Sequence, residues 1–135
     1  MPVNADELKE FATRYTAAWC SQNPASVAAF YAEEGSLTIN DGVPSVGRPA
    51  ITIAAQDFMT AFPDMVVTMR DVSLDGSSAV YRWTLRGTNI GPGGSGNNLV
   101  IDGYEEWIIG ADDLIAESEG HFDEAEYQRQ LKNGV

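Results

Sequence analysis

The sequence predicts an α+β fold in which helices come first and a meander of strands follows. In the first half of the chain, apolar residues recur at steps of three and four, which is the period of a helix that buries one face. From about residue 64 the apolar period changes to two, and the connections between runs are short enough for antiparallel pairing. A length of 135 residues allows one domain, so we expect residues 1–135 to form a single unit.

Local signals place three helices in the first half. Asn4 followed by Glu7 has the spacing of a capping box, and Pro24 stands at the first position of a second helix. Pro63 ends the third helix, because proline cannot continue a helical hydrogen-bond pattern. The expected helices cover about residues 5–21, 24–34 and 48–62.

Strands account for most of the remaining chain. Leu37 and Ile39 alternate with polar residues before the turn signal Asn40-Asp41-Gly42, which indicates a first strand. Four more strands are expected at about 64–74, 78–88, 98–109 and 113–122, and a last helix from Asp123 toward Leu131. Helices that cover one face of a curved antiparallel sheet leave a concave pocket, which is the default ligand site in a small domain of this class.

Composition excludes several classes of partner and cofactor. The chain has 8 Lys and Arg against 20 Asp and Glu, so it lacks the basic surface that nucleic acids and anionic membranes require. Its single cysteine, Cys20, has no internal disulfide partner, and one histidine excludes the usual zinc sites rich in His and Cys. The segment Met1–Glu7 has neither a basic nor an apolar run of a leader peptide, so we expect a cytoplasmic protein.

Several segments together carry a family resemblance over nearly the whole chain. They are the first helix with Tyr15, Phe30–Gly35, Gly47–Ile51, Trp83–Gly91, and Leu114–Glu117 with Phe122-Asp123. In this order they resemble the SnoaL-like polyketide cyclases, within the superfamily of ketosteroid isomerase and nuclear transport factor two. The resemblance implies a cone-shaped, cystatin-like fold: a curved, mostly antiparallel sheet wrapped around three N-terminal helices, with a short C-terminal helix and a homodimer formed through the outer sheet face.

The same resemblance implies roles for particular residues. Asp123 matches the general acid/base of the cyclases, and Tyr15 and Asp102 match the oxyanion-hole positions of the isomerases, whose mechanism is a known reference case. The isomerases carry their base, an aspartate, on the first strand, and the matching stretch here is Thr38-Ile39-Asn40. This departure argues against steroid isomerase chemistry.

Alternation along the last strand leaves two interpretations open. Glu117, Glu119, His121 and Asp123 share one face; in the pocket, their mutual repulsion and burial would raise carboxyl pKa values toward neutrality, as acid/base catalysis requires. The alternative is a solvated outer face. Asp123 also has an alternative role as a helix N-cap with Glu126, and Phe122 and Tyr127 are then placed as a hydrophobic staple.

The fourth expected strand, at about 98–109, is equally ambiguous. Asp102, Tyr104 and Glu106 share one face, and Ile101, Glu105 and Trp107 share the other. An aromatic-lined cavity follows from the resemblance. The substrate contacts expected on these grounds are Trp19, Asn40, Phe58, Trp83, Tyr104, Glu117 and Glu119.

Two functions follow from these observations. The first is cofactor-independent acid/base chemistry of the cyclase or isomerase type on a small, hydrophobic, carbonyl-bearing polyketide- or steroid-like compound, without metal or nucleotide. Asp123 or His121 would move the proton, with help from Asp102 and Tyr15. The second is a non-catalytic module of the same fold that binds a small molecule or mediates dimerisation.

Overall fold

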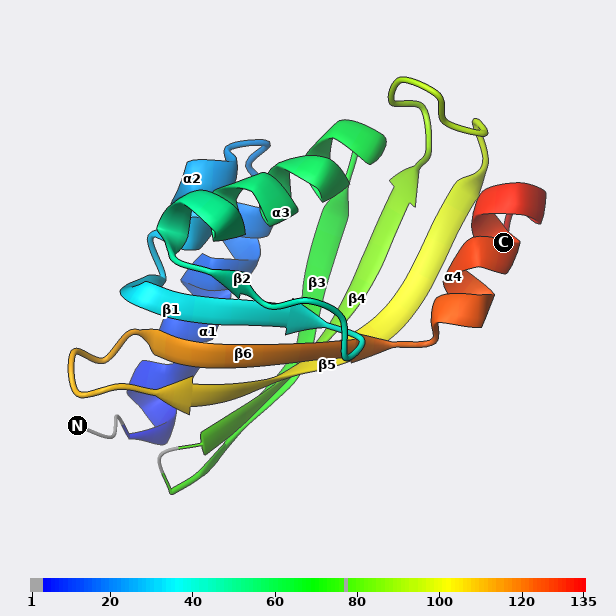
Figure 1. The fold of residues 1–135 in the computed structure, drawn as a ribbon. Coiled ribbons are helices and arrows are strands. Elements are labelled where there is room, and N and C mark those ends of the chain that lie inside the picture. The colour runs from blue at the N-terminus through cyan, green and yellow to red at the C-terminus, as the bar shows by residue number, and fades with distance from the viewer. Residues whose placement is uncertain (1–3, 77) are drawn as a thin grey trace.

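Helices and strands follow one another in the order that the sequence predicts (Figure 1). The computed structural model describes residues 4–76 and 78–135. Met1–Val3, part of the segment used for the leader-peptide prediction, lie outside these residues. The described elements are α1 (Ala5–Trp19), α2 (Pro24–Ala28), β1 (Tyr31–Ile39), β2 (Ser45–Val46), α3 (Arg48–Ala61), β3 (Val66–Asp75), β4 (Ser78–Thr88), β5 (Asn98–Ile109), β6 (Ile115–Phe122) and α4 (Glu124–Asn133).

The strands form one six-stranded sheet in the order β2-β1-β6-β5-β4-β3. Every neighbouring pair is antiparallel except β1 and β6, which are parallel. The sheet is curved and open, and α1 and α3 pack on its concave side (Figure 1). The predicted α+β fold, with a curved and mostly antiparallel sheet, is therefore confirmed.

The helix boundaries follow from local chemistry, with one correction. The capping box of α1 is present, because the Asn4 side chain accepts from the Glu7 N–H and Glu7 reaches back to the Asn4 N–H. The second helix ends at Ala28, not near residue 34. Tyr31 begins β1 instead, since it pairs with Ile115 of β6 and buries its ring completely.

Alternation on β5 decides which residues face the interior. Its odd-numbered positions are buried and its even-numbered positions are exposed along the whole strand. Trp107 is fully buried against the ring of Tyr81, and Glu105, two positions earlier, points to the same side. A carboxyl group is thereby carried into an otherwise apolar interior.

The last helix, α4, lies beside β5 at one end of the sheet (Figure 1). β6 ends opposite Gly103, so the earlier part of β5 has no strand on that side. There the side chain of Gln130 accepts from the Val100 N–H at 2.7 Å and donates to the Val100 carbonyl at 2.9 Å. The helix thus covers the strand edge that β6 leaves open.

In the described part of the chain, no helix combines the length and the apolar character that spanning a membrane requires.

Candidate functional site

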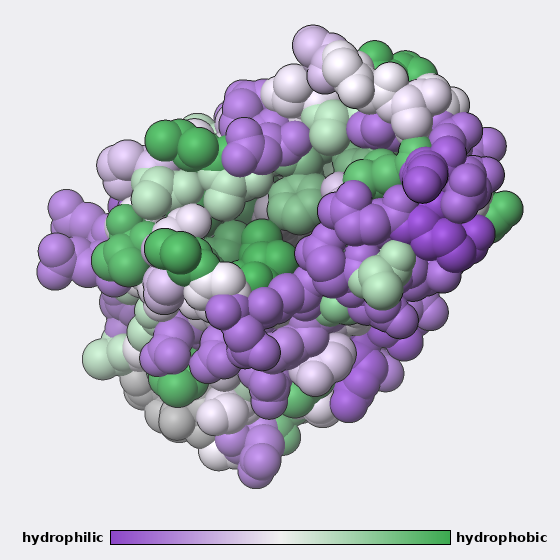
Figure 2. Space-filling model, turned by 45° about the vertical axis from the view of Figure 1, so that its right-hand side comes forward, coloured by the Kyte–Doolittle hydropathy of each residue, from purple (hydrophilic) through white to green (hydrophobic). Residues whose placement is uncertain are grey.

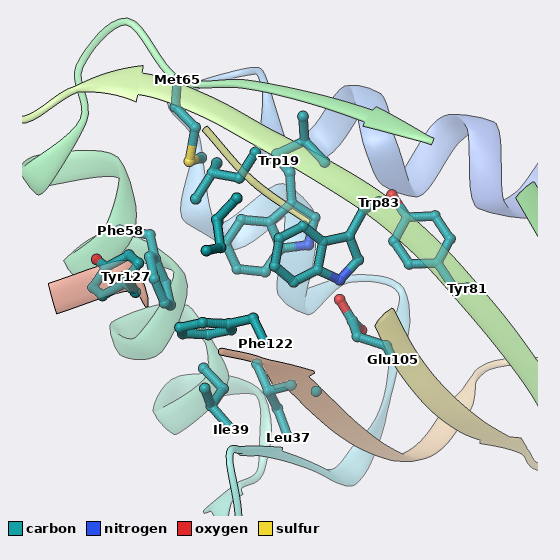
Figure 3. Close-up of a pocket in the computed structure, with 14 residues that line it drawn as sticks. Trp19, Leu37, Ile39, Phe58, Met65, Tyr81, Trp83, Glu105, Phe122 and Tyr127 are labelled. Atoms are coloured by element: carbon teal, nitrogen blue, oxygen red, sulfur yellow. The ribbon is translucent and has the colours of Figure 1, made fainter. Parts of the chain in front are cut away.

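An apolar cavity lies between the concave face of the sheet and helices α1, α3 and α4 (Figure 3). It encloses about 610 Å³ including its open mouth. Figure 2 shows hydrophobic residues at the bottom of a hollow whose rim is hydrophilic on the right-hand side and carries hydrophobic residues on the left. The residues that line it are Trp19, Leu37, Ile39, Phe58, Met65, Val67, Tyr81, Trp83, Leu85, Ile101, Glu105, Gly120, Phe122 and Tyr127.

Glu105 is the one carboxylate among these lining residues, and its side chain points into the cavity (Figure 3). Its Oε1 atom accepts three hydrogen bonds: from the Tyr15 hydroxyl at 2.9 Å, the Trp107 indole N–H at 2.9 Å and the Ser118 hydroxyl at 2.8 Å. These donors come from α1, β5 and β6, so the carboxyl group is held from three directions. Its second oxygen, Oε2, accepts none of these three bonds.

A second tyrosine extends this network away from the cavity. The hydroxyls of Tyr15 and Tyr31 lie 2.8 Å apart, and both rings are completely buried. Since the single proton of Tyr15 is donated to Glu105, Tyr31 donates to Tyr15. Burial, followed by the nearby Glu105 carboxylate, raises the pKa of both hydroxyls well above the usual value, so both remain protonated donors.

Burial also raises the pKa of Glu105 above its usual value of 4.5. The hydrogen bonds from Trp107, Ser118 and Tyr15 act in the opposite direction, because they stabilise the carboxylate, but desolvation is the larger effect. Because Oε1 already accepts three bonds, a proton on this carboxyl group occupies Oε2. The cavity therefore meets either a carboxylate oxygen or a carboxylic O–H at this point.

Four of the predicted site residues belong to this arrangement. Trp19, Phe58 and Trp83 line the cavity from α1, α3 and β4. Tyr15 lies beneath it and does not line it; its hydroxyl contacts Glu105 instead of the cavity. In this geometry Tyr15 positions the carboxyl group and is not itself in contact with a ligand.

The other predicted residues lie outside the cavity. On β6 the inward side chains are those of Ser118 and Phe122, together with Gly120, so the alternating acidic positions face outward. Of the two interpretations of that strand, the solvated outer face is the correct one. The residues placed outside the cavity are Asn40, Asp102, Tyr104, Glu117, Glu119, His121 and Asp123.

Asp102 does not take the place beside Tyr15 that the resemblance implied. Its carboxylate accepts from the Thr84 hydroxyl at 2.6 Å and lies 4.0 Å from the Arg70 guanidinium on the outer side of the sheet. The alternation of β5 is the reason, because an even-numbered position cannot share the inner face with Trp107. Glu105 occupies the position that the prediction gave to Asp102.

Asp123 caps α4. Its side chain accepts from the Glu126 N–H at 3.0 Å, and the rings of Phe122 and Tyr127 pack 5.2 Å apart as the predicted staple.

Asp123 also borders a shallow outer hollow with Asn40, Asp102, Tyr104 and His121. There the His121 ring lies over Tyr104 at 4.9 Å, and its Nε2 is 3.2 Å from Glu106 without hydrogen-bond geometry.

Glu105 is not among the site residues predicted from the sequence. It stands on one strand face with Ile101 and Trp107, and the signal that could have found it is the presence of a single charged residue on that apolar face. A charge on a buried face is retained only with hydrogen-bond partners, and these come from Tyr15 and Ser118, which are distant in the sequence.

Solved structures of the same fold cover almost the whole chain. TsrD from Streptomyces laurentii is 20% identical with a TM-score of 0.81, and 96% of this chain aligns with 97% of that one. A hypothetical protein from Catenulispora acidiphila with a ketosteroid isomerase-like fold, in complex with trimethylamine, is 16% identical with a TM-score of 0.80, over 90% of this chain and 92% of that one. The epoxide hydrolase/cyclase-like enzyme SalBIII is 14% identical with a TM-score of 0.76, over 90% and 94%.

Comparison by sequence gives the family. No curated protein matches this chain significantly. The family described as the SnoaL-like domain matches residues 12–118, which run from α1 to the middle of β6 and include Tyr15, Glu105 and Ser118. This match shows that the chain belongs to the SnoaL-like domain family, and the solved structures show that it has the ketosteroid isomerase-like fold.

Proposed function

We propose that this protein carries out cofactor-independent acid/base chemistry on a small, hydrophobic, carbonyl-bearing compound, and that Glu105 is the residue that moves the proton. The observation that supports this most directly is a single buried carboxyl group on the wall of an apolar cavity, with its free oxygen toward the ligand space. Burial brings the pKa of such a group closer to neutrality, where general acid/base catalysis is most effective.

The proposed step begins with Glu105 as a carboxylate. Its Oε2 removes a proton from the carbon next to the carbonyl, and the electron pair of that C–H bond becomes the enolate. Return of the proton to another carbon of the conjugated system gives isomerisation. Attack of the enolate carbon on a second carbonyl forms a C–C bond, and the proton on Oε2 passes to the new alkoxide, which gives cyclisation. Tyr15, Trp107 and Ser118 hold Oε1 in both protonation states.

The other ionisable groups of the lining do not act as bases near neutral pH. Burial raises the pKa of Tyr127 to about 12, and burial also raises that of Tyr81. Glu105 is thus the base that the described lining offers. Among solved structures of this fold, SalBIII is associated with pyran ring formation, which is consistent with a scaffold that accommodates ring-forming chemistry.

Deuterium exchange at the carbon next to the carbonyl tests this proposal, because it measures enolisation without knowledge of the natural substrate. We expect the wild type to accelerate exchange of α-tetralone and β-tetralone in deuterium oxide, followed by NMR. Glu105→Gln should lower the rate about 100-fold or more, since it removes the proton-transfer group and keeps the shape. Glu106→Gln, the adjacent outward-facing carboxylate, is the matched control and should leave the rate unchanged.

A binding module of the same fold is the second candidate. The observation that favours it is that the described lining holds one carboxyl group and no second acid or base that titrates near neutrality. Binding of the tetralones without any acceleration of exchange would support this function and contradict the catalytic one.

A further inference from the structure

Two tryptophans of the cavity wall carry indole N–H groups without a well-aligned acceptor in the protein. The Nε1 atoms of Trp19 and Trp83 are buried and make no hydrogen bond of regular geometry within residues 4–76 and 78–135, although the Trp19 indole interacts with the Tyr15 hydroxyl closely enough to oppose the rise in pKa that burial causes there. Trp19 is only 8% exposed. A buried donor without an acceptor destabilises the folded state, and most buried polar groups in proteins are paired. Two such donors in one cavity therefore indicate that a hydrogen-bond acceptor on a bound ligand pairs with them.

The fold holds Trp83 in place through a glycine. Trp83 pairs with Gly103 across β4 and β5, and a Cβ atom at Gly103 would lie 2.3 Å from the Cζ2 atom of the indole. The edge of the ring therefore lies against the β5 backbone at Gly103, where any other residue would displace it. Cζ2 is on the nitrogen side of the indole, and the next inward position on β5 is Glu105. The N–H of Trp83 is thus placed on the side of the cavity that holds the carboxyl group.

Trp19 reaches the same region from the helix layer. It stands one turn after Tyr15 on α1, and the two rings pack edge to face at 6.3 Å. Tyr15 donates to Glu105, so the shared helix face brings the Trp19 indole toward that carboxyl group. Figure 3 shows the indole nitrogens of Trp19 and Trp83 and the oxygens of Glu105 directed toward the same part of the cavity.

We propose that Trp19 and Trp83 donate their indole N–H groups to one oxygen atom of the ligand, beside Glu105. The site then takes a neutral, apolar molecule with a ketone oxygen, because an anion would be repelled by Glu105 and a hydrocarbon would leave both donors unpaired. This part of the inference rests on the proposed function: the ketone oxygen becomes the negatively charged enolate oxygen, and the two indole N–H groups stabilise that charge while Oε2 of Glu105 takes the proton. The binding part of the inference stands without turnover.

Two probes with the same carbon skeleton separate the contribution of the carbonyl oxygen to the affinity from that of the apolar rings. Tetralin and α-tetralone differ by the carbonyl group, and tetralin is the more hydrophobic of the two. We expect Trp19→Phe and Trp83→Phe each to lower the affinity for α-tetralone about fivefold, which corresponds to one net hydrogen bond, and to leave that for tetralin within about twofold. Both variants keep an aromatic ring in the wall.

The wild type supplies a second readout that needs no variant. The chain has 3 tryptophans, so its NMR spectrum contains three indole N–H signals. We expect the signals of Trp19 and Trp83 to move downfield when α-tetralone is added and to respond weakly to tetralin. Trp107 is the internal control, because its N–H is already donated to Glu105 and its signal should remain in place.

Three results would overturn the inference. The first is that both variants bind α-tetralone with the affinity of the wild type. The second is that the indole N–H signals do not shift when α-tetralone is added, and the third is that α-tetralone does not bind. Signals that respond to Glu105→Gln but not to the ketone would assign the two donors to Glu105 itself. Failure of the proposed function looks different. In that case the indole signals respond to the ketone, but deuterium exchange is not accelerated.

Discussion

Glu105 has two oxygens in different surroundings, and this difference determines what it can do. Three donors meet Oε1, while Oε2 accepts none of these bonds. A proton on the group is thereby directed to one atom, and the donors keep that atom in a fixed position. The single side chain can be an acid or a base without any change of rotamer, which suits a reaction that removes and returns one proton.

The raised pKa of Glu105 makes stability depend on pH. The folded state holds the proton more tightly than the unfolded chain, so unfolding releases a proton above pH 4.5, the usual pKa. Stability contributed by the protonated form is complete below that pH and is lost as pH rises through the folded-state pKa. We expect the stability of Glu105→Gln relative to the wild type to increase with pH over this window, measured by urea unfolding. Glu106→Gln should parallel the wild type, and a Glu105→Gln curve parallel to the wild type would contradict the prediction.

A substitution at Tyr15 tests whether its hydroxyl positions the Glu105 carboxyl group. Tyr15→Phe removes one donor from Oε1, so the pKa of Glu105 rises further and the midpoint of the pH dependence of deuterium exchange moves to higher pH. Loss of a buried hydrogen bond also lowers the free energy of unfolding by about 1–3 kcal/mol. Tyr104→Phe, on the exposed face of β5, is the control. An unmoved midpoint would show that Tyr15 contributes to stability alone.

At the scale of the element, periodicity predicted nearly every helix and strand, because each has a regular apolar pattern and a cap or turn at its end. The inward face of β5 and β6 could not be predicted. β5 carries charges on both faces, and the charged face of β6 could line either a polar pocket or the protein surface. The choice depends on partners from α1 and from the neighbouring strand. Glu105 is tolerated inside because Tyr15 and Ser118 meet it there. The two-residue strand β2 is too short for any periodic signal.

The start of α4 separates a structural from a catalytic role for Asp123. Its carboxylate accepts from the Glu126 N–H at the first turn of the helix. We expect Asp123→Ala to lower the free energy of unfolding by about 1 kcal/mol and Asp123→Asn, which keeps a capping side chain, to change it little. Neither should affect deuterium exchange. If Asp123→Asn lost deuterium exchange and kept its thermal stability, Asp123 would have a catalytic role and this prediction would be wrong.

At the scale of the whole molecule, the outer face of the sheet differs from the rest of the surface. Val100, Tyr104 and Ile108 are exposed on the outward face of β5, with Asp102 and Glu106 between them. Arg82 pairs with Asp71 at 2.8 Å on the same side. Exposed large apolar side chains gathered on one face are a feature of protein interfaces. The formal charge of -12 opposes association, because two copies repel each other.

We expect the protein to form a homodimer through this face, and salt to strengthen it by screening the repulsion. Ile108→Asp should give monomers in sedimentation velocity at micromolar concentration. Ile53→Asp, at an exposed position of α3, is the matched control and should remain dimeric. A wild type that sediments as a monomer at every salt concentration would rule out the interface.

The pairing of Gln130 with Val100 ties access to the cavity to the protection of the sheet. One side chain makes the two backbone contacts that a seventh strand would make, so this stretch of β5 is closed to pairing with another chain. Tyr127, three positions earlier on α4, forms part of the cavity wall. A movement of α4 wide enough to admit a ligand past Tyr127 breaks both contacts and exposes the strand edge to other molecules. The wall of the cavity and the protection of this strand edge therefore depend on the same helix.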